Sequence, residues 1–215
     1  MSNPDSFIDE VTEEVRRDKL FALMKKYGWI GILLVLLIVG GAAWNEWQKS
    51  QRQAASEAFG DAVLGALDND DPAARLKALA AIGATGDRGA ILDLLLAGDP
   101  VTDKAGALAA LDKVAADATL SDAYRDLAVL RRVLIAGKDM PLAERRTALE
   151  AIAIAGRPYR PLALEQLALL QVEDGDAPGA IKALTELVQL QEATQATRAR
   201  VGQLIVALGG EPPAQ

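Results

Sequence analysis

The feature that most constrains this chain is an uncharged apolar stretch near its start. The 19 residues from Tyr27 to Asn45 contain no Asp, Glu, Lys or Arg. A helix of that length rises about 28 Å, close to the roughly 30 Å hydrocarbon core of a bilayer. The three Trp residues, Trp29, Trp44 and Trp47, lie near its two ends, and Trp rings favour the membrane interface. The sequence therefore predicts a transmembrane helix over residues 27–45.

The charges that flank this stretch predict its orientation. Five basic residues lie shortly before it and two shortly after it: Arg16, Arg17, Lys19, Lys25 and Lys26, then Lys49 and Arg52. Because Lys and Arg are enriched on the cytoplasmic side, we expect the N-terminus to be cytoplasmic and the rest of the chain to lie across the membrane. A cleaved signal peptide is the alternative. Against it, the apolar stretch exceeds the usual core of about 7–15 residues, and six carboxylates precede it.

Residues 1–26 form an arm with its own pattern. Residues 5–26 predict an amphipathic helix in which acidic side chains come first and basic ones follow, as the helix dipole favours. Two interpretations remain open for this arm. It is either a cytoplasmic docking helix for a membrane partner or a helix lying on the inner leaflet with its basic residues near anionic head groups.

Composition excludes several kinds of chemistry. The chain has no His and no Cys, so a zinc finger, any metal site built on His or Cys, a Cys nucleophile and a Ser–His triad are impossible, and any metal would have to sit on carboxylates alone. The net charge of −7 argues against nucleic acid as a partner, because backbone binding needs a basic face. An enzyme would have to use carboxylates, Lys or Tyr, and no such residues cluster. We expect no catalytic, cofactor-binding or metal site, no cofactor and no small-molecule substrate.

The remainder of the chain reads as helical. Ala and Leu dominate it, and Gly, Pro and Asp separate its apolar-periodic runs. The predicted helices are 45–67, 72–82, 87–97, 102–117, 121–136, 141–154, 159–174, 177–191 and 194–208. We therefore expect a helical domain over residues 46–208 and a flexible tail over 209–215. The turn that contains Asp68, Asp70 and Asp71 resembles the start of a cation-binding loop, but the later Gly and Glu of a calcium loop are missing. A helix-capping turn is therefore expected there.

A repeated pattern of large and small residues predicts how these helices pair. It is clearest in residues 161–191, where small residues on two successive helices allow a close crossing: Leu164, Leu167, Ala168, Gly175, Ala180, Leu184 and Leu187. Similar sets occur 40 and 73 residues earlier: Tyr124, Leu127 and Ala128, then Ile91, Leu94 and Leu95, with Ala107, Leu111 and Val114 on the next helix. This spacing resembles tetratricopeptide repeats. The fold class expected is all-α, with one transmembrane helix followed by an α-solenoid of antiparallel helix pairs. A generic Ala-rich helical bundle is the alternative.

Several short sequence segments, spread over nearly the whole chain, resemble those of a known family of proteins. They are Phe7 to Glu14, Arg16 to Leu20, Tyr27 to Trp29, Ala123 to Ala128 and Gly156 to Ala163. With this layout the chain resembles single-span bacterial inner-membrane proteins with a tetratricopeptide-like periplasmic domain, typified by the ancillary subunit of the Sec translocon, and most of all their alphaproteobacterial branch. The resemblance implies a non-enzymatic adaptor whose partners are Sec translocon subunits, a periplasmic chaperone and translocating polypeptides. A scaffold or assembly factor for another envelope complex is the alternative.

If the first helices of successive pairs line a concave face, positions offset from the packing residues form a candidate protein-binding groove. On the helices 121–136 and 159–174 these positions are Asp122, Arg125, Val129, Arg132, Leu162, Glu165, Leu169 and Val172. Arg125 and Arg160 each follow a Tyr at a helix start, so a structural role is the competing interpretation for both.

Overall fold

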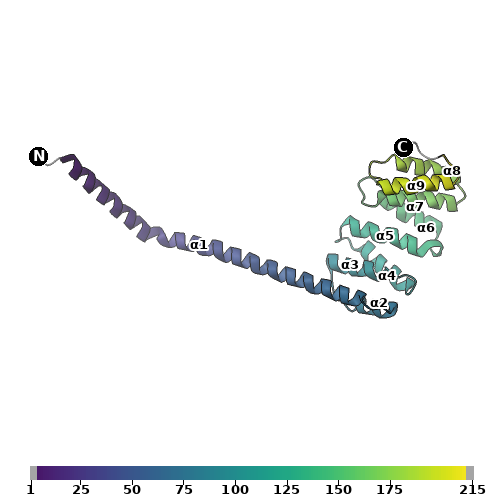
Figure 1. Cartoon of the computed structure of the whole chain (residues 1–215), viewed down its shortest axis with the longest axis horizontal. Coiled ribbons are helices and arrows are strands. Elements are labelled where there is room, and N and C mark those ends of the chain that lie inside the picture. The colour runs from purple at the N-terminus through teal and green to yellow at the C-terminus, as the bar shows by residue number, and fades with distance from the viewer. Residues whose placement is uncertain (1–3, 212–215) are drawn as a thin grey trace. The chain divides into compact units, whose positions relative to one another are not determined.

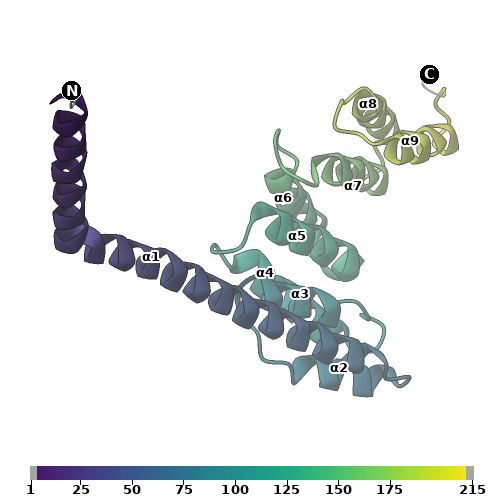
Figure 2. The same cartoon turned by 60° about the vertical axis from the view of Figure 1, so that its left-hand side comes forward.

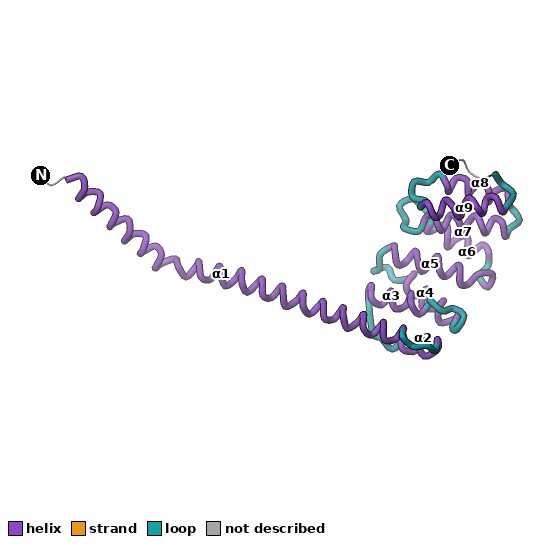
Figure 3. Tube along the Cα trace, in the orientation of Figure 1, coloured by secondary structure: helices purple, strands orange, loops and turns teal. Residues whose placement is uncertain are grey.

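The computed structural model describes the backbone of residues 4–211 and the side chains of Arg17 and of residues 21–211. All regular structure in this part of the chain is helical (Figures 1 and 3). The fold class predicted from the sequence is thereby confirmed. The chain divides into two units, Met1–Asp61 and Ala62–Gln215. Most side chains of the predicted amphipathic arm, and residues 212–215 of the predicted tail, lie outside the described part.

Helix α1 spans Pro4–Leu67 as one element of 64 residues. It contains the predicted helix over 5–26, the apolar stretch and the helix predicted to follow it, without a break between them. The segment Phe21–Leu67 is long and apolar enough to cross a membrane, with a mean hydropathy of 2.0 in its most apolar window. Every side chain from Phe21 to Ala58 is exposed in the isolated chain. The segment is therefore a candidate membrane span.

Eight shorter helices follow. Their bounds are α2 Pro72–Ala80, α3 Gly86–Leu96, α4 Lys104–Ala116, α5 Asp122–Ala136, α6 Leu142–Ile152, α7 Arg160–Glu173, α8 Ala177–Val188 and α9 Gln195–Ala207, with the short 3-10 turn η1 at Gly137–Asp139. Each lies within a few residues of a predicted helix. Consecutive helices from α2 to α9 pack against each other, most extensively α4 with α5 and α7 with α8 (Figure 2).

Turn chemistry explains where these helices begin. The carboxylates of Asp71, Asp103 and Asp176 accept hydrogen bonds from backbone N–H groups in the first turns of α2, α4 and α8. Such caps satisfy donors that a helix start leaves without partners. The capping role predicted for the 68–71 turn is confirmed by Asp71. After α7, Gly175 adopts a φ of +87°, which only Gly adopts without strain.

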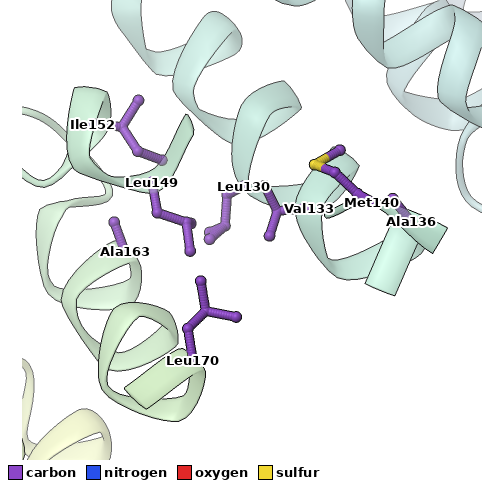
Figure 4. Packing of buried hydrophobic residues seen from close by; sticks show 8 residues of the cluster. All are labelled: Leu130, Val133, Ala136, Met140, Leu149, Ile152, Ala163 and Leu170. Carbon is purple, nitrogen blue, oxygen red and sulfur yellow. The ribbon is translucent and has the colours of Figure 1, made fainter. Parts of the chain in front are cut away.

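The interior consists of three successive apolar clusters. The first joins α3, α4 and α5 and contains Ala107, Leu111, Val114 and Ala128. The second joins α5, α6 and α7 around Leu130, Leu149 and Ala163 (Figure 4). The third joins α7, α8 and α9: Ala168, Ala180, Leu184, Leu187, Val201 and Ile205. The predicted packing of the 161–191 unit is confirmed for Leu164, Ala168, Ala180, Leu184 and Leu187, whereas Leu167 packs against the second cluster. The small residues Ala168 and Ala180 let α7 and α8 approach closely.

A small residue at the α7–α8 crossing is therefore essential. Ala180 is fully buried, and Ala180→Leu should lower the free energy of unfolding by about 1–3 kcal/mol, because the added atoms force the helices apart. The measurement is chemical denaturation of the solubilised protein followed by circular dichroism. Ala199→Leu, at an exposed position of α9, is the matched control and should change stability by less than about 0.5 kcal/mol. Equal effects of both would contradict the packing assignment.

Candidate protein-binding surface

Buried carboxylates on α5 and α7 connect each of these helices to the next part of the solenoid. Asp126 of α5 is fully buried and forms an ion pair with Arg157, in the segment before α7. Glu165 of α7 is 4% exposed and accepts two hydrogen bonds from Arg200 of α9, at 2.7 Å from Nε and 2.6 Å from Nη2. Two-pronged arginine–carboxylate pairs fix geometry as well as charge. These four side chains therefore hold consecutive repeats in register.

The same kind of pair joins α6 to α7, in a different electrostatic setting. Arg145 of α6 donates from both terminal nitrogens to Glu173 at 2.8 and 2.6 Å, and this hydrogen bonding lowers the pKa of Glu173. Burial, by contrast, raises the pKa of Asp126, and the hydrogen bond from Arg157 opposes that effect only in part. Desolvation and ion pairing thus shift the two carboxyls in opposite directions.

Other arginines bind the carbonyl ends of neighbouring helices. Arg131 of α5 donates to the carbonyl oxygens of Leu94 and Ala97 at the end of α3, at 2.8 and 2.7 Å. Arg198 of α9 donates to the carbonyl of Val188, the last residue of α8, and to that of Leu190 just after it. The last carbonyls of a helix lack partners within it, and basic side chains complement the negative end of its dipole. These guanidinium groups are consequently structural.

One face of the first helices of each pair remains apolar and open. On α5, Leu127 and Leu134 are seven residues apart and so share a face. By the helix period this face lies between two others: the face of Asp126, which points toward the start of α7, and the face of Arg131, which points toward α3. Leu162 and Leu169 occupy the corresponding face of α7, where Leu162 also packs against the second apolar cluster, and Ile91 is exposed on α3. Leu134 is 52% exposed and Ile91 37%. We call these five residues, Ile91, Leu127, Leu134, Leu162 and Leu169, the first-helix stripe.

The groove residues predicted on α5 lie on a different side of that helix. Arg132 forms ion pairs with Asp112 of α4 and, at 3.4 Å, with Glu144 of α6. Val129 packs against the second apolar cluster. Asp122 binds Arg157 at 2.7 Å and Arg125 at 3.6 Å. The structure therefore places these four side chains toward α4, α6 and the segment before α7, away from the stripe.

The residues predicted on α7 are divided between the stripe and the interior. Leu169 belongs to the stripe and is half-buried, and Leu162 lies at its edge, half-buried and packed against the second apolar cluster. Glu165 is occupied by Arg200, and Val172 packs against the third apolar cluster. Arg160 donates to the carbonyl of Ala153 and to Glu192, which is the structural role that the sequence left open for it. The predicted set is thus not brought together on one surface.

The stripe residues on α3 and α5 were missed because their register was assigned differently. The repeat pattern placed Leu127 inward beside Tyr124 and Ala128. In the structure Tyr124, Ala128 and Ile135 pack into the first apolar cluster, whereas Leu127 is half-buried and belongs to none of the three clusters. The signal that could have found the stripe is the seven-residue spacing of Leu127 and Leu134, which matches that of Leu162 and Leu169 on α7.

Other sites for chemistry are poorly supported. Within residues 21–211 no three carboxylates gather in a way that could hold a metal ion. A cavity of about 150 Å³ lies at the start of α3, lined by Gly86, Gly89, Asp93, Lys113 and others. Two of its three charged lining residues neutralise each other, since Lys113 Nζ lies 2.8 Å from an Asp93 carboxylate oxygen, and Asp117 is the third. The first-helix stripe is the better candidate for a binding surface.

The opposite pKa shifts predict opposite pH trends for two variants. The lowered pKa of Glu173 means that its stabilisation is present above the ordinary glutamate pKa and is lost as the pH falls through the folded-state pKa. Glu173→Gln should therefore destabilise the protein at neutral pH, and its difference from wild type should shrink in acid. Denaturation midpoints measured across pH test this, with Glu150→Gln, an exposed carboxylate on α6, as the control.

The pH dependence of the stabilisation by Asp126 should have the opposite sign. Because its pKa is raised in the folded protein, its favourable contribution is present below the ordinary aspartate pKa and is lost as the pH rises through the folded-state value. The stability of wild type relative to Asp126→Asn should accordingly decrease as the pH rises. Parallel trends for the two variants would show that desolvation does not dominate at Asp126.

Comparison with known proteins agrees with this architecture. The sequence matches the tetratricopeptide repeat-like domain family over residues 23–153, from within α1 to the end of α6. No match was found among curated proteins or among solved structures. Helices α7 to α9 extend the same helix-pair packing beyond the matched residues. Since the match covers more than half of the 215 residues, the chain belongs to the tetratricopeptide repeat-like domain family.

Proposed function

We propose that the protein is a non-enzymatic, membrane-anchored adaptor that binds other proteins through its repeat domain. The observation that carries the proposal is the first-helix stripe, an open apolar face on a scaffold whose charged residues are largely occupied by one another. Repeat domains of this family are typically protein-binding modules. The apolar stretch of α1 supports the membrane anchor.

We further propose a place in protein export. The protein would lie in the bacterial inner membrane with residues 1–26 in the cytoplasm and the repeat domain in the periplasm. There it would associate with the Sec translocon and hand newly translocated polypeptides to periplasmic chaperones. Two features support this placement: the excess of basic residues before the apolar stretch and the resemblance in layout to the ancillary translocon subunit.

The proposed topology has a direct test. An alkaline phosphatase reporter fused after Gln215 should be active, because this enzyme needs the oxidising periplasm, and a green fluorescent protein fused in its place by the same export route should be dark. The reverse result would place the repeat domain in the cytoplasm. It would overturn the export proposal while leaving the protein-binding role open.

Partner identity is tested by quantitative affinity purification from native membranes in mild detergent. The full chain should enrich translocon subunits and a periplasmic chaperone. A chain that lacks residues 1–26 should lose the translocon if the arm is the docking helix, and should retain it if the arm only lies on the membrane. Enrichment of a different envelope complex would transfer the function to a scaffold for that assembly.

A further inference from the structure

We infer that the first-helix stripe binds apolar polypeptide segments that carry basic residues, and that it does not bind acidic ones. This inference rests on the proposed protein-binding role and adds the chemistry of the partner. It follows from the apolar side chains that the stripe exposes and from the contacts that the neighbouring charged residues already make within the chain.

The apolar part of the recognition comes from the stripe itself. Leu134 and Ile91 present large aliphatic side chains to solvent on α5 and α3, and Leu127 of α5 and Leu162 and Leu169 of α7 are half-buried. Apolar area removed from water contributes to binding roughly in proportion to its extent. A partner that places aliphatic or aromatic side chains along these helices gains that contribution, whereas a polar segment does not.

The charge preference comes from the arginines. Binding of an acidic segment requires cations that are free to pair with it. Every basic residue of α5, α7 and α9 already interacts within the chain: Arg125, Arg131, Arg132, Arg160, Arg198 and Arg200. Arg88, the single basic residue of α3, also interacts within the chain. Recruiting Arg131, Arg132, Arg160, Arg198 or Arg200 to a partner would break a contact between different helices or their connecting segments, whereas Arg125 pairs with Asp122 of its own helix.

Negative charge, by contrast, remains available. Asp87 is exposed and lies four residues before Ile91, so both share one face of α3. Between residues 62 and 215 the chain has 21 acidic and 16 basic residues. Asp87 and the net negative charge of the domain therefore favour a basic segment over an acidic one at the α3 end of the stripe.

The test uses the full-length protein in nanodiscs of zwitterionic lipid, with empty nanodiscs as the background. Four fluorescent peptides of equal length share one framework: Leu-rich with two Lys, with two Ser or with two Glu, and a Lys-containing version in which Ser replaces every Leu. Fluorescence anisotropy should show tightest binding for the Leu-rich Lys peptide, weaker binding for the Ser version and weakest binding for the Glu version. The Leu-free peptide should not bind measurably.

Variants locate the binding on the stripe. The double change Ile91→Ser and Leu134→Ser should weaken binding of the Leu-rich Lys peptide about tenfold, since two apolar contacts are lost. The matched control is Val101→Ser with Ile154→Ser, two exposed apolar residues in loops, at 96% and 58% exposure, and it should bind like wild type. Asp87→Lys should weaken the Lys peptide severalfold and leave the Ser peptide unchanged.

Two outcomes would overturn the inference: binding of the Glu peptide as tight as that of the Lys peptide, or equal loss in the stripe and control variants. If translocon subunits are recovered from membranes but the peptide preference is absent, the partner chemistry is wrong and the adaptor role stands. If the preference and its dependence on Ile91 and Leu134 are observed while no translocon subunit is recovered, the inference stands and the export role fails.

Discussion

Close packing of neighbouring helices across alanine is the interaction on which the repeat domain depends. Ala128, Ala163, Ala168 and Ala180 are each buried where one helix crosses another. A small side chain there lets the larger Leu and Ile residues of the facing helix reach the interior. Because each helix packs mainly against its neighbours in the chain, the stability of the solenoid is close to a sum of such local interfaces.

Cores built around alanine bury little apolar area per crossing, and the ion pairs between repeats add the geometric specificity that small side chains lack. Asp126 with Arg157 and Glu165 with Arg200 each connect one repeat to the next. A buried pair of this kind is not a large source of net stability, because both partners lose hydration. It does define one register, since any other arrangement leaves a buried charge without a partner.

This use of charge shapes the surface that remains. With the arginines committed to carboxylates and helix ends, the side of the solenoid that faces away from α4 and α6 has aliphatic side chains as its main free feature. The proposed binding surface is in this sense a consequence of how the scaffold is held together, because the arginines that could pair with an acidic partner already make contacts within the fold. The register of the repeats and the proposed partner chemistry are therefore physically linked.

Much of the architecture was predictable from local sequence signals. Helix bounds followed from apolar periodicity and from Asp, Gly and Pro at the breaks, as Asp71 and Gly175 show. The small residues of the α7–α8 crossing followed from their spacing. Such signals involve residues that lie within one or two helical turns of one another, so a single sequence contains them in full.

The candidate surface was predictable only in part, for a physical reason. Leu162 and Leu169 are among the predicted groove positions and also lie on the stripe, whereas Leu127, which the repeat pattern assigned to the interior, is half-buried there, and Arg132, predicted to line the groove, pairs with Asp112 and Glu144. An amphipathic helix with apolar residues on more than one side does not by itself reveal which side meets its neighbours. The sequence alone determined the helices, their breaks, the apolar stretch and the absence of His and Cys chemistry. Tertiary structure decided which face of α5 stays open and which arginines are occupied, because both depend on contacts between residues some 30 positions apart, such as Arg157 with Asp126 and Arg200 with Glu165.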